Sequence, residues 1–535
     1  MPQPAKATEH EPASRPLRVA MICLGCAKNL VDAEIMLGAL KQQGIELTHD
    51  AAAADALVVN TCAFIDAAQE ESVDAILESD HLRQAKQRGQ ALIVAGCLPQ
   101  RFRQQLPKLL PEVDAFVGVD QVTQIPELVR QAVERRAQRL ASQQPACPAG
   151  NGRFATTQQR RPGSPGQPSQ HRHLALKARQ AQSLPRPVVA VSARPRYIPD
   201  WTTPRVRLTP SHYAYVKIAE GCNHPCSFCV IPQVRGPYRS RPMADILHEA
   251  RRLIAAGVKE LNLISQDTTY YGLDLWPRPR PSAATPERFA AAQAQCPAEA
   301  PTLARLLRQL DALPGQFWIR LLYTHPAHWT DELIQTIADC SKVVCYIDLP
   351  LQHIHPTLLE RMRRETSAEY LMELIGRLRA RLPGVALRTT FIVGFPGETE
   401  ACFQRLLEFV RQTRFERLGV FTYSKEAGTR AARMQGQVPA RVKRTRRDLL
   451  MATQRQIARQ IAAASVGRTL QVLVERPAAP DELQVETADY MVARSAADAP
   501  EIDGRVYVRG RLPVGEFALV KVVGHTDYDL IAEPA

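Results

Sequence analysis

Long apolar runs are absent from this sequence of 535 residues. No stretch approaches the roughly 18 consecutive apolar residues that a membrane-spanning helix needs, so we expect no membrane partner. The opening segment, MPQPAKATEHEPASRPLR, also lacks the apolar core of a secretory signal. We therefore expect a cytoplasmic protein whose 12 cysteines stay reduced. Reduced cysteines point to metal or redox chemistry rather than to disulfides.

Acidic residues are scarce in one segment, and basic residues are scarce in another. The chain has 68 Lys and Arg against 54 Asp and Glu, and its net charge of +14 suggests a nucleic-acid partner. Residues 141–206 hold ten basic residues and one acid, whereas residues 471–535 hold six basic residues and twelve acids. The basicity is therefore local. A tail with twice as many acids as bases would repel phosphate and favours a basic partner; an acidic surface that only aids solubility is the alternative.

Hydrophobic periodicity is missing from two stretches. Residues 136–207 are rich in Pro, Gln, Ser and Arg, which predicts a disordered basic linker. Residues 277–301 repeat Pro, Ala and Gln, which predicts an irregular surface insertion. A chain of this length exceeds one hydrophobic core, so we expect about three domains. Their predicted ranges are 17–135, 208–446 and 447–530.

The three domains differ in their strand patterns. The first alternates short apolar runs with helical stretches, which predicts an α/β domain with a Rossmann-like parallel sheet. The second repeats a strand and a helix six times, which predicts a (β/α)6 partial barrel. The third has short strands only, which predicts a small β-barrel. The six strands of the middle domain are expected at 214–219, 260–265, 318–323, 343–349, 387–393 and 418–423.

A fourth cysteine is missing from the densest cysteine group. Cys222, Cys226 and Cys229 lie within eight residues, directly after the first predicted strand of the middle domain. A structural zinc site needs four ligands, and His224 is awkwardly placed to join both of its neighbouring cysteines. Three thiolates suit a four-iron, four-sulfur cluster whose remaining iron can bind a small chelating molecule. A zinc site and a loop of incidental cysteines are the alternatives.

Three other cysteines are dispersed, but each follows a predicted strand of the first domain. Cys26 follows RVAMICLG, Cys62 follows ALVVNT and Cys97 follows ALIVAG. Loops at the carboxyl ends of parallel strands converge on one crevice, so the three thiols could hold a second cluster with one open iron. The alternative is that these cysteines only pack as small apolar residues at strand ends.

The CxxxCxxC motif after the first barrel strand resembles the radical S-adenosylmethionine enzymes. In that family the open iron is chelated by S-adenosylmethionine, and cleavage of the sulfonium yields a 5′-deoxyadenosyl radical. The resemblance implies that Phe228 packs near the adenine and that Ile392 and Gly394 contact the same cofactor. The alternatives are that Phe228 caps the barrel and that Gly394 serves the geometry of a turn.

Further stretches narrow the resemblance. LGCAKNLVDAE, NTCAFI and AGCLPQR resemble, in this order, the N-terminal domain of the methylthiotransferases. This implies that Cys26, Cys62 and Cys97 bind an auxiliary cluster that carries the sulfur to be transferred. Cys23 forms a CxxC pair with Cys26 and is the alternative ligand, but its place within the strand favours packing. ISQDTTYYGLD, LPLQHIHPTLLERMRR, LRTTFIVGFPGETE and ARSAADAPEIDG resemble the branch that modifies an aspartate of ribosomal protein S-twelve, the last of them in a TRAM-like tail.

The resemblance implies an enzyme with two [4Fe-4S] clusters and S-adenosylmethionine as cofactors. The resemblance further implies that one S-adenosylmethionine would methylate the sulfur on the auxiliary cluster. A second would yield the radical that removes a β-hydrogen from the aspartate of S-twelve, and the resulting carbon radical would capture the methylthio group. An electron donor such as a flavodoxin or ferredoxin is implied, and the basic linker and residues 441–459 could contact ribosomal RNA. The alternatives are a tRNA adenosine methylthiotransferase and a non-catalytic iron–sulfur protein that binds RNA or senses redox state.

Overall fold

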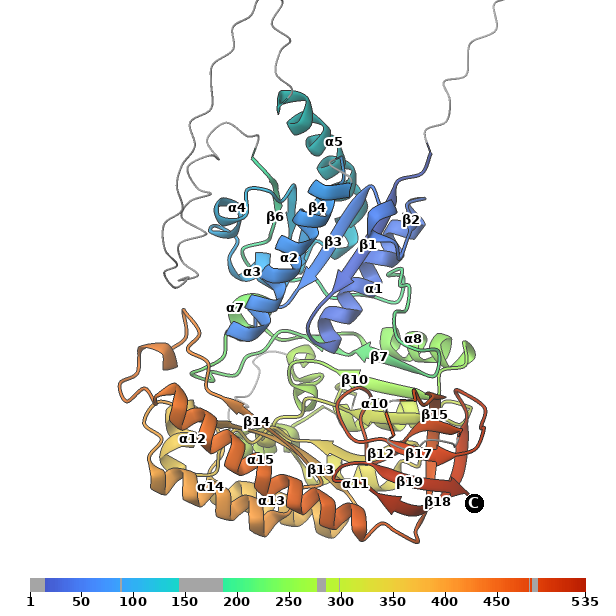
Figure 1. Cartoon of the computed structure of the whole chain (residues 1–535). Helices are drawn as coiled ribbons and strands as arrows, with labels where there is room; N and C mark the ends of the chain where they lie inside the picture. Colours follow the sequence, from blue (N-terminus) through green and yellow to red (C-terminus); the bar gives the residue numbers. More distant parts are fainter. Residues whose placement is uncertain are drawn as a thin grey trace, which may run out of the picture. The chain divides into compact units, whose positions relative to one another are not determined.

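The structure is a computed structural model that describes residues 15–86, 89–143, 186–276, 285–297, 299–480, 482–483 and 489–535. Two compact units make up the chain (Figure 1). The boundary between them runs near residues 193–207, with Phe64–Asp66 belonging to the second unit and Pro204–Val206 to the first. Much of the predicted linker, residues 144–185, and the first part of the predicted insertion, residues 277–284, lie outside the described residues.

The first unit is built on a parallel sheet with the strand order β2-β1-β3-β4-β5-β6. Its strands β3 and β4 are buried along their whole length, which explains their continuous apolar sequences. The strand order reverses between β1 and β3, and ligands of open α/β sheets bind at such a point. The predicted Rossmann-like parallel sheet is confirmed. The strands are β1 (Arg18–Cys23), β2 (Glu46–Leu47), β3 (Ala56–Thr61), β4 (Ala91–Gly96), β5 (Ala115–Val117) and β6 (Val188–Ala190).

Two parts of the range predicted as a disordered linker are ordered. The last helix of the first unit continues to Gln143, and β6 pairs in parallel with β5. A three-residue strand is too short to show a period in the sequence, and its backbone is satisfied only by a neighbour far along the chain. The helices of this unit are α1 (Ala27–Gln42), α2 (Asp66–Lys86), α3 (Cys97–Arg101), α4 (Leu106–Leu109) and α5 (Ile125–Gln143).

The second unit contains a parallel sheet with the order β14-β13-β12-β11-β10-β7. Because β7 and β14 form its two edges, the sheet is the predicted partial barrel rather than a closed one. Outward-facing side chains such as Val216, Leu263 and Leu321 join the large core beneath the surrounding helices. The strands are β7 (Tyr213–Lys217), β10 (Glu260–Ile264), β11 (Trp318–Leu321), β12 (Val343–Asp348), β13 (Ala386–Val393) and β14 (Arg417–Thr422).

The insertion predicted to be irregular contains a helix. Thr285 caps α9 by accepting a hydrogen bond from the Arg288 amide at 3.4 Å, and Phe289 packs with Leu273 and Trp276 in a small separate core. A short helix with so little apolar surface gives a weak sequence period. The helices of the second unit are α7 (Ile231–Arg235), α8 (Met243–Ala255), α9 (Pro286–Ala294), α10 (Leu303–Asp311), α11 (Asp331–Asp339), α12 (Pro356–Met362), α13 (Ala368–Arg381), α14 (Glu400–Thr413) and α15 (Ala440–Ala463).

The C-terminal strands close into the predicted small barrel, in the order β15-β16-β17-β19-β18 (Figure 1, red). The helix α15 precedes it, so its strands begin at Thr469, later than the predicted domain start at residue 447. Among the described residues, no helix is long and apolar enough to cross a membrane. The strands are β15 (Thr469–Pro477), β16 (Tyr490–Ser495), β17 (Val506–Arg509), β18 (Phe517–His525) and β19 (Leu530–Pro534).

Buried ion pairs join the small barrel to the amino ends of the central strands. Glu260, the first residue of β10, accepts hydrogen bonds from Arg320 of β11 at 2.6 Å and from Arg494 of β16 at 2.5 Å. None of these three side chains is more than 2 % exposed. These buried ion pairs connect the two barrels to each other.

The same junction uses several acids of the C-terminal tail. The Tyr213 hydroxyl donates to Glu501 at 2.6 Å, the Tyr346 hydroxyl donates to Asp503 at 2.7 Å, and Arg417 pairs with Asp498. These acids belong to the ADAPEID segment, so part of the negative charge counted in residues 471–535 is neutralised within the chain. The net charge of the tail is therefore weaker support for a basic partner than the count of charged residues alone indicated.

Candidate functional site

Cys222, Cys226 and Cys229 lie on the loop that follows β7 and the short strand β8 (Ala219–Glu220), at the carboxyl ends of the central strands. The loop begins with a glycine at φ +86°, and a Cβ atom at Gly221 would lie 2.1 Å from the Pro237 carbonyl oxygen. Only glycine fits this approach. The backbone therefore turns sharply before the first cysteine and directs the loop across the end of the barrel.

Each of the three sulfur atoms accepts a hydrogen bond. The amide of His224 donates to Cys222 Sγ at 3.5 Å, the amide of Ile231 donates to Cys229 Sγ at 3.4 Å, and Arg364 Nη1 lies 3.5 Å from Cys226 Sγ. Burial raises the pKa of Cys229 to about 12 and that of Cys222 well above its usual range. Such buried thiols become thiolates when a metal binds, and N–H···S bonds stabilise the sulfur ligands of iron–sulfur clusters. The donor set fits a cluster with three cysteine ligands.

Glu220 braces the start of the cysteine loop. Its carboxylate accepts hydrogen bonds from Lys217 of β7 at 2.7 Å and from Gln266, which follows β10, at 2.6 Å. Burial opposes the charged form, but Lys217 and Arg235 outweigh it and lower the pKa of Glu220 to about 2. The side chain thus ties the loop to two neighbouring strands.

The structure brings Phe228 and Ile392 into one apolar cluster. Both pack against a group that includes Phe395, whose ring meets the Phe228 ring edge-to-face at 6.4 Å between centroids. Gly394 has φ +73°, and a Cβ atom there would lie 2.3 Å from Lys443 Cγ. The positive φ and the nearby Lys443 side chain therefore explain why residue 394 is a glycine, and no ligand is needed for this explanation.

Cys26, Cys62 and Cys97 follow three adjacent strands of the first unit at nearly the same level. Cys23 of β1 is in register with Asn60 of β3, which is in register with Ala95 of β4. Cys62 and Cys97 thus lie two residues, and Cys26 three residues, after positions that are aligned across the three strands. A Cβ atom on Gly25 would come within 2.8 Å of Cys62 Cβ, so the first two loops touch. These loops converge as the strand pattern predicts.

The side chain of Asn29 links these loops by hydrogen bonds. Its side-chain amide donates to the Leu24 carbonyl at 2.6 Å and to the Thr61 carbonyl at 3.2 Å, which lie beside Cys26 and Cys62. Gly96, before Cys97, has φ +96°, and a Cβ atom there would lie 3.1 Å from Asn29 Oδ1. The buried side chain of Asn29 therefore lies close to the backbone one or two residues before each of the three cysteines.

Cys23 and Cys26 occupy different environments. Cys26 is exposed and is the N-cap residue of α1. Cys23 lies within β1, where Asn60 Nδ2 is 3.7 Å from its sulfur, and burial raises its pKa to about 11. The strand thiol is therefore held neutral.

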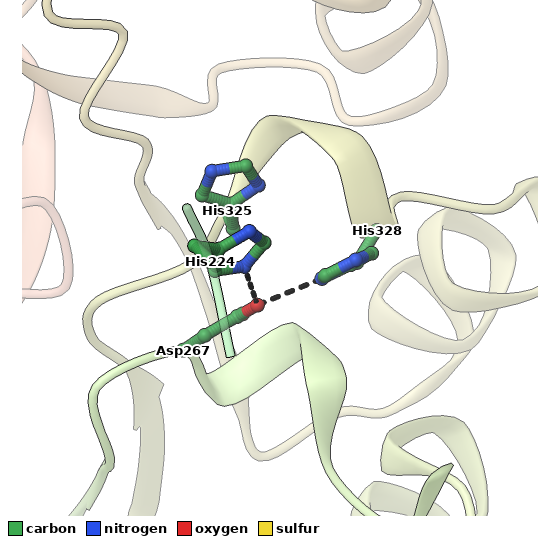
Figure 2. Close-up of side chains that lie close together, drawn as sticks. All are labelled: His224, Asp267, His325 and His328. Atoms are coloured by element: carbon green, nitrogen blue, oxygen red, sulfur yellow. Dashed lines mark hydrogen bonds and ion pairs between the residues drawn. The ribbon is translucent and has the colours of Figure 1, made fainter. Parts of the chain in front are cut away.

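A group of side chains beside the three-cysteine loop was not predicted as a site (Figure 2). His224, Asp267, His325 and His328 offer nitrogen and oxygen atoms that all lie within 4.8 Å of one another. Asp267 follows β10, and His325 and His328 follow β11. The strand pattern could have indicated them, because Asp267, His325 and His328 follow parallel strands just as Cys26, Cys62 and Cys97 do.

Buried polar atoms without a hydrogen-bond partner among the described residues gather at this end of the sheet. They come from loops that follow β10, β11 and β12. Native proteins satisfy most buried polar atoms, so such a group marks a place for a polar ligand or for water. The atoms include Gln266 Oε1, His325 Nε2, His353 Nε2, His355 Nδ1 and Arg364 Nε.

Comparison with known proteins defines the class of the chain. It matches the Radical SAM superfamily over residues 216–410, the Uncharacterized protein family UPF0004 over residues 18–118 and the TRAM domain over residues 466–534. A partial parallel barrel with three cysteines on the loop after its first strand is the arrangement that the radical S-adenosylmethionine match spans. The chain is a radical S-adenosylmethionine enzyme.

Its relatives define the family more closely. The ribosomal protein uS12 methylthiotransferase RimO of Opitutus terrae is 50% identical over 521 residues, or 97% of each chain. RimO of Akkermansia muciniphila is 45% identical over 97% of this chain and 100% of its own length. The chain belongs to the RimO family of methylthiotransferases. A solved structure of the radical S-adenosylmethionine methyltransferase TsrM from Kitasatospora setae aligns with a TM-score of 0.47 and 15% identity, over 76% of this chain and 73% of that one.

Proposed function

We propose that this enzyme methylthiolates the β-carbon of an aspartate of ribosomal protein uS12 in the cytoplasm. The observation that carries the proposal is its 50% identity, over 97% of both chains, to a protein named for action on uS12. The arrangement of the cysteines agrees with this chemistry, because it provides two separate three-thiol sites on two different parallel sheets.

Cys222, Cys226 and Cys229 would hold the radical-generating [4Fe-4S] cluster, and Cys26, Cys62 and Cys97 the auxiliary one. When bound, the first supplies the electron that cleaves S-adenosylmethionine, and the second presents the sulfur. Support for the first set is the hydrogen bond at each sulfur. Support for the second is the shared register of its strands.

S-Adenosylmethionine would lie over the apolar cluster that contains Phe228 and Ile392. An adenine ring packs favourably on such a surface, and the polar atoms of the same end can orient its hydrogen-bonding edge. Gly394 would lie beside the cofactor without donating to it, because its amide already donates to Glu398.

The substrate uS12 would be a protein of the small ribosomal subunit, and a flavodoxin or ferredoxin would supply electrons. Ribosomal RNA contact would use α15, where Arg441, Arg444, Arg455 and Arg459 are exposed along one helix. Phosphate binding needs such side chains. The linker residues 144–185, also predicted to touch RNA, lie outside the described residues.

Mass spectrometry of uS12 and of tRNA from a deletion strain tests the substrate. We expect the methylthio group to disappear from the uS12 aspartate while tRNA methylthioadenosine is unchanged. An unchanged uS12 together with missing methylthioadenosine would establish the tRNA enzyme instead. Purified protein that fails to cleave S-adenosylmethionine under reduction would favour a non-catalytic iron–sulfur protein.

Iron and sulfide content tests the cluster count. We expect about eight irons in the anaerobically reconstituted wild type and about four in a Cys26→Ala, Cys62→Ala, Cys97→Ala variant. The matched control is Cys23→Ala, which should keep about eight irons, because this thiol lies within β1. A loss of iron in the control would assign Cys23 as a ligand.

A further inference from the structure

A pocket of about 490 Å³ lies in the second unit, at the end of the central strands opposite the three-cysteine loop. Its walls come from the beginnings of β13 and β14, from the middle of α15 and from two loops of the small barrel, residues 502–504 and 528–529. Its volume is in the range of protein sites for small ligands. No residue of its lining belongs to the cysteine loop or to the apolar cluster of Phe228, so the pocket is a separate site.

The side chain of Gln454 on α15 gives this pocket an unused hydrogen-bond acceptor. Gln454 is 2 % exposed, and its Nε2 donates to the Phe415 carbonyl at 2.8 Å. Because a carbonyl only accepts hydrogen bonds, this contact fixes which end of the amide is the oxygen. Gln454 Oε1 is buried and has no hydrogen-bond partner within the described residues. A buried acceptor of this kind marks a place for a donor of a ligand or for water.

Both guanidinium groups of the lining are paired within the fold. Arg417 donates to Asp498 through Nε at 3.0 Å and through Nη2, and to the Glu416 carbonyl through Nη1 at 2.9 Å. Arg388 Nη1 donates to Asp348 at 2.8 Å. Asp498 and Asp348 lie outside the lining, so acids beyond the pocket compensate its two positive charges.

The three carboxylates of the lining are compensated less completely. Asp529 accepts hydrogen bonds from a backbone amide at 2.8 Å and from a threonine hydroxyl at 3.4 Å, and the described part of the chain gives it no ion pair. Asp503 lies 3.6 Å from Arg388 Nε, and burial raises its pKa. Glu416 is paired with Arg379 at 3.1 Å. Carboxylate oxygens only accept hydrogen bonds, so the pocket suits a cationic ligand that donates several of them.

The exposed rim of the pocket suits a flat cation on an apolar stem. Tyr528 and Ile502 belong to the lining, and each is 45 % exposed. A guanidinium group stacks on aromatic rings and is less strongly hydrated than an ammonium group, while the methylene stem of arginine covers apolar surface. Its five N–H donors also match an acceptor-rich wall better than the three donors of lysine.

A phosphate backbone fits the lining poorly, because the carboxylates repel it. The exposed side chains of Arg455 and Arg459 lie on α15 outside the lining, and they are better placed for phosphate than the pocket is. A protein that itself binds RNA is rich in Lys and Arg and can present a guanidinium group to the pocket. The lining therefore favours a basic protein over a nucleic acid.

We propose that this pocket binds the guanidinium group of an arginine side chain of a basic partner protein, which under the proposed function is uS12. Gln454 Oε1 and the Asp529 carboxylate would be its acceptors, and the Tyr528 ring would cover its flat face. The identity of the partner rests on the proposed function, whereas the chemistry of the ligand rests on the pocket. An arginine held here would add affinity for the substrate at the end of the strands opposite the radical chemistry.

Titration calorimetry with N-acetyl-arginine amide on the anaerobically reconstituted full chain tests the pocket. We expect binding at a single site and affinity at least about tenfold weaker for the neutral N-acetyl-citrulline amide. Asp529→Asn and Gln454→Leu should each weaken binding of the arginine probe about tenfold, and Tyr528→Leu about threefold. Asp527→Asn is the matched control, because this carboxylate lies two residues from Asp529 but outside the lining, and it should not change the affinity.

Several results would overturn the inference. These are no binding of the arginine probe, equal affinity for the citrulline probe, or tighter binding of N-acetyl-lysine amide. A single-stranded RNA of about ten nucleotides that displaces the arginine probe, and that binds more tightly to Asp529→Asn, would make the pocket an RNA site instead. If Gln454→Leu does not fold, as judged by its melting temperature, the isosteric Asp529→Asn and the exposed Tyr528→Leu decide.

Turnover with purified uS12 separates this inference from the proposed function. We expect Asp529→Asn to raise the KM for uS12 about tenfold, and Asp527→Asn to leave it unchanged. Methylthiolation of uS12 by an enzyme that does not bind the arginine probe would overturn the inference and leave the proposed function standing. Binding of the probe by an enzyme that does not modify uS12 would support the pocket and defeat the proposed function.

Discussion

The amino ends and the carboxyl ends of the six central strands both bury charged side chains, but they differ in how many buried polar atoms lack a hydrogen-bond partner. At the amino ends, Glu260 is paired with Arg320 and Arg494. One nitrogen of Arg320 lacks a hydrogen-bond partner among the described residues, and its guanidinium lies 4.7 Å from the centre of the Tyr346 ring. At the carboxyl ends, buried polar atoms without such a partner in the described chain include those of Gln266, His325, His353, His355 and Arg364.

At β10 and β11, the two ends of the central strands therefore have different roles, one in joining the barrels and the other in binding ligands. The ion pairs at the amino ends connect β10 and β11 with β16, so they serve to join the two barrels. The carboxyl ends keep thiols, imidazoles and amides available, as parallel barrels do at the end where they bind ligands. Two residues there, Tyr323 and Gln352, also adopt positive φ values of 61° and 73°. Such strain persists at sites that the surrounding fold holds in place.

The largest expected effect is at the carboxyl ends. Cys226→Ala should reduce S-adenosylmethionine cleavage to the level of a protein-free control and lower the iron content by about four per chain, because three ligands are needed. Its melting temperature without cluster should remain close to that of the wild-type apoprotein. Product analysis by chromatography measures the loss. Cys296→Ala, in the loop after α9, is the control and should keep both properties; retained cleavage in Cys226→Ala would contradict the ligand assignment.

A change at the amino ends should act on stability instead. Arg494→Ala leaves Glu260 with one partner in a buried setting, so we expect a loss of about 3 kcal/mol in the free energy of unfolding of the second unit. Chemical denaturation measures it. Arg511→Ala is the control, because its pair with Asp489 is largely exposed and should contribute under about 1 kcal/mol. Equal effects of the two variants would contradict the prediction that the buried ion pair at the amino ends contributes more to stability than an exposed pair.

Acid should destabilise the carboxyl ends through His353. Burial lowers its pKa to about 3, and its Nδ1 accepts hydrogen bonds from the Ile354 and His355 amides at 2.9 and 3.0 Å. The unfolded chain binds this proton near pH 6.5, so the stabilisation is present above that pH and declines as the pH falls toward 3.

Between pH 7.5 and pH 5 this decline should amount to about 2 kcal/mol. Denaturation at the two pH values measures it in the wild type and in His353→Gln, whose difference between the two pH values should be smaller by that amount. His248→Gln, exposed on α8, should behave like the wild type. An unaltered difference in His353→Gln would show that His353 is not the group responsible.

The smallest expected effect is again at the amino ends. Tyr346→Phe removes the hydroxyl that donates to Asp503 at 2.7 Å, but Asp503 keeps the Ala499 amide as a donor. We expect a loss of about 1 kcal/mol and unchanged S-adenosylmethionine cleavage. Tyr370→Phe is the control, since its hydroxyl contacts a carbonyl outside the junction. Reduced cleavage by Tyr346→Phe would link the junction to the site.

Much of the fold could be predicted from the sequence, because its strands are long and apolar. All six central strands begin and end within a few residues of the expected positions. The strand β6 and the helix α9 were not predicted, since three residues and a short, alanine-rich helix give no clear period. The convergence of Cys26, Cys62 and Cys97 was predicted, but only because parallel strands end at one edge.

The site itself was predicted unevenly. His224 was considered only as an unsuitable zinc ligand, and its partners Asp267 and Glu365 lie 43 and 141 residues away. No local pattern joins residues at such distances. The acids of the ADAPEID segment were assigned to a basic partner, because a count of charges does not tell which of them face Tyr213, Tyr346 and Arg417 of the same chain.

The sequence by itself determined the three-cysteine loop, the strand pattern and the family, since these depend on residues that are neighbours along the chain. Tertiary structure alone decided which charges are neutralised internally and which side chains surround the cysteine loop. The physical reason is that hydrogen bonds and charge interactions act over a few ångströms in space. Folding brings together groups that the linear order keeps far apart.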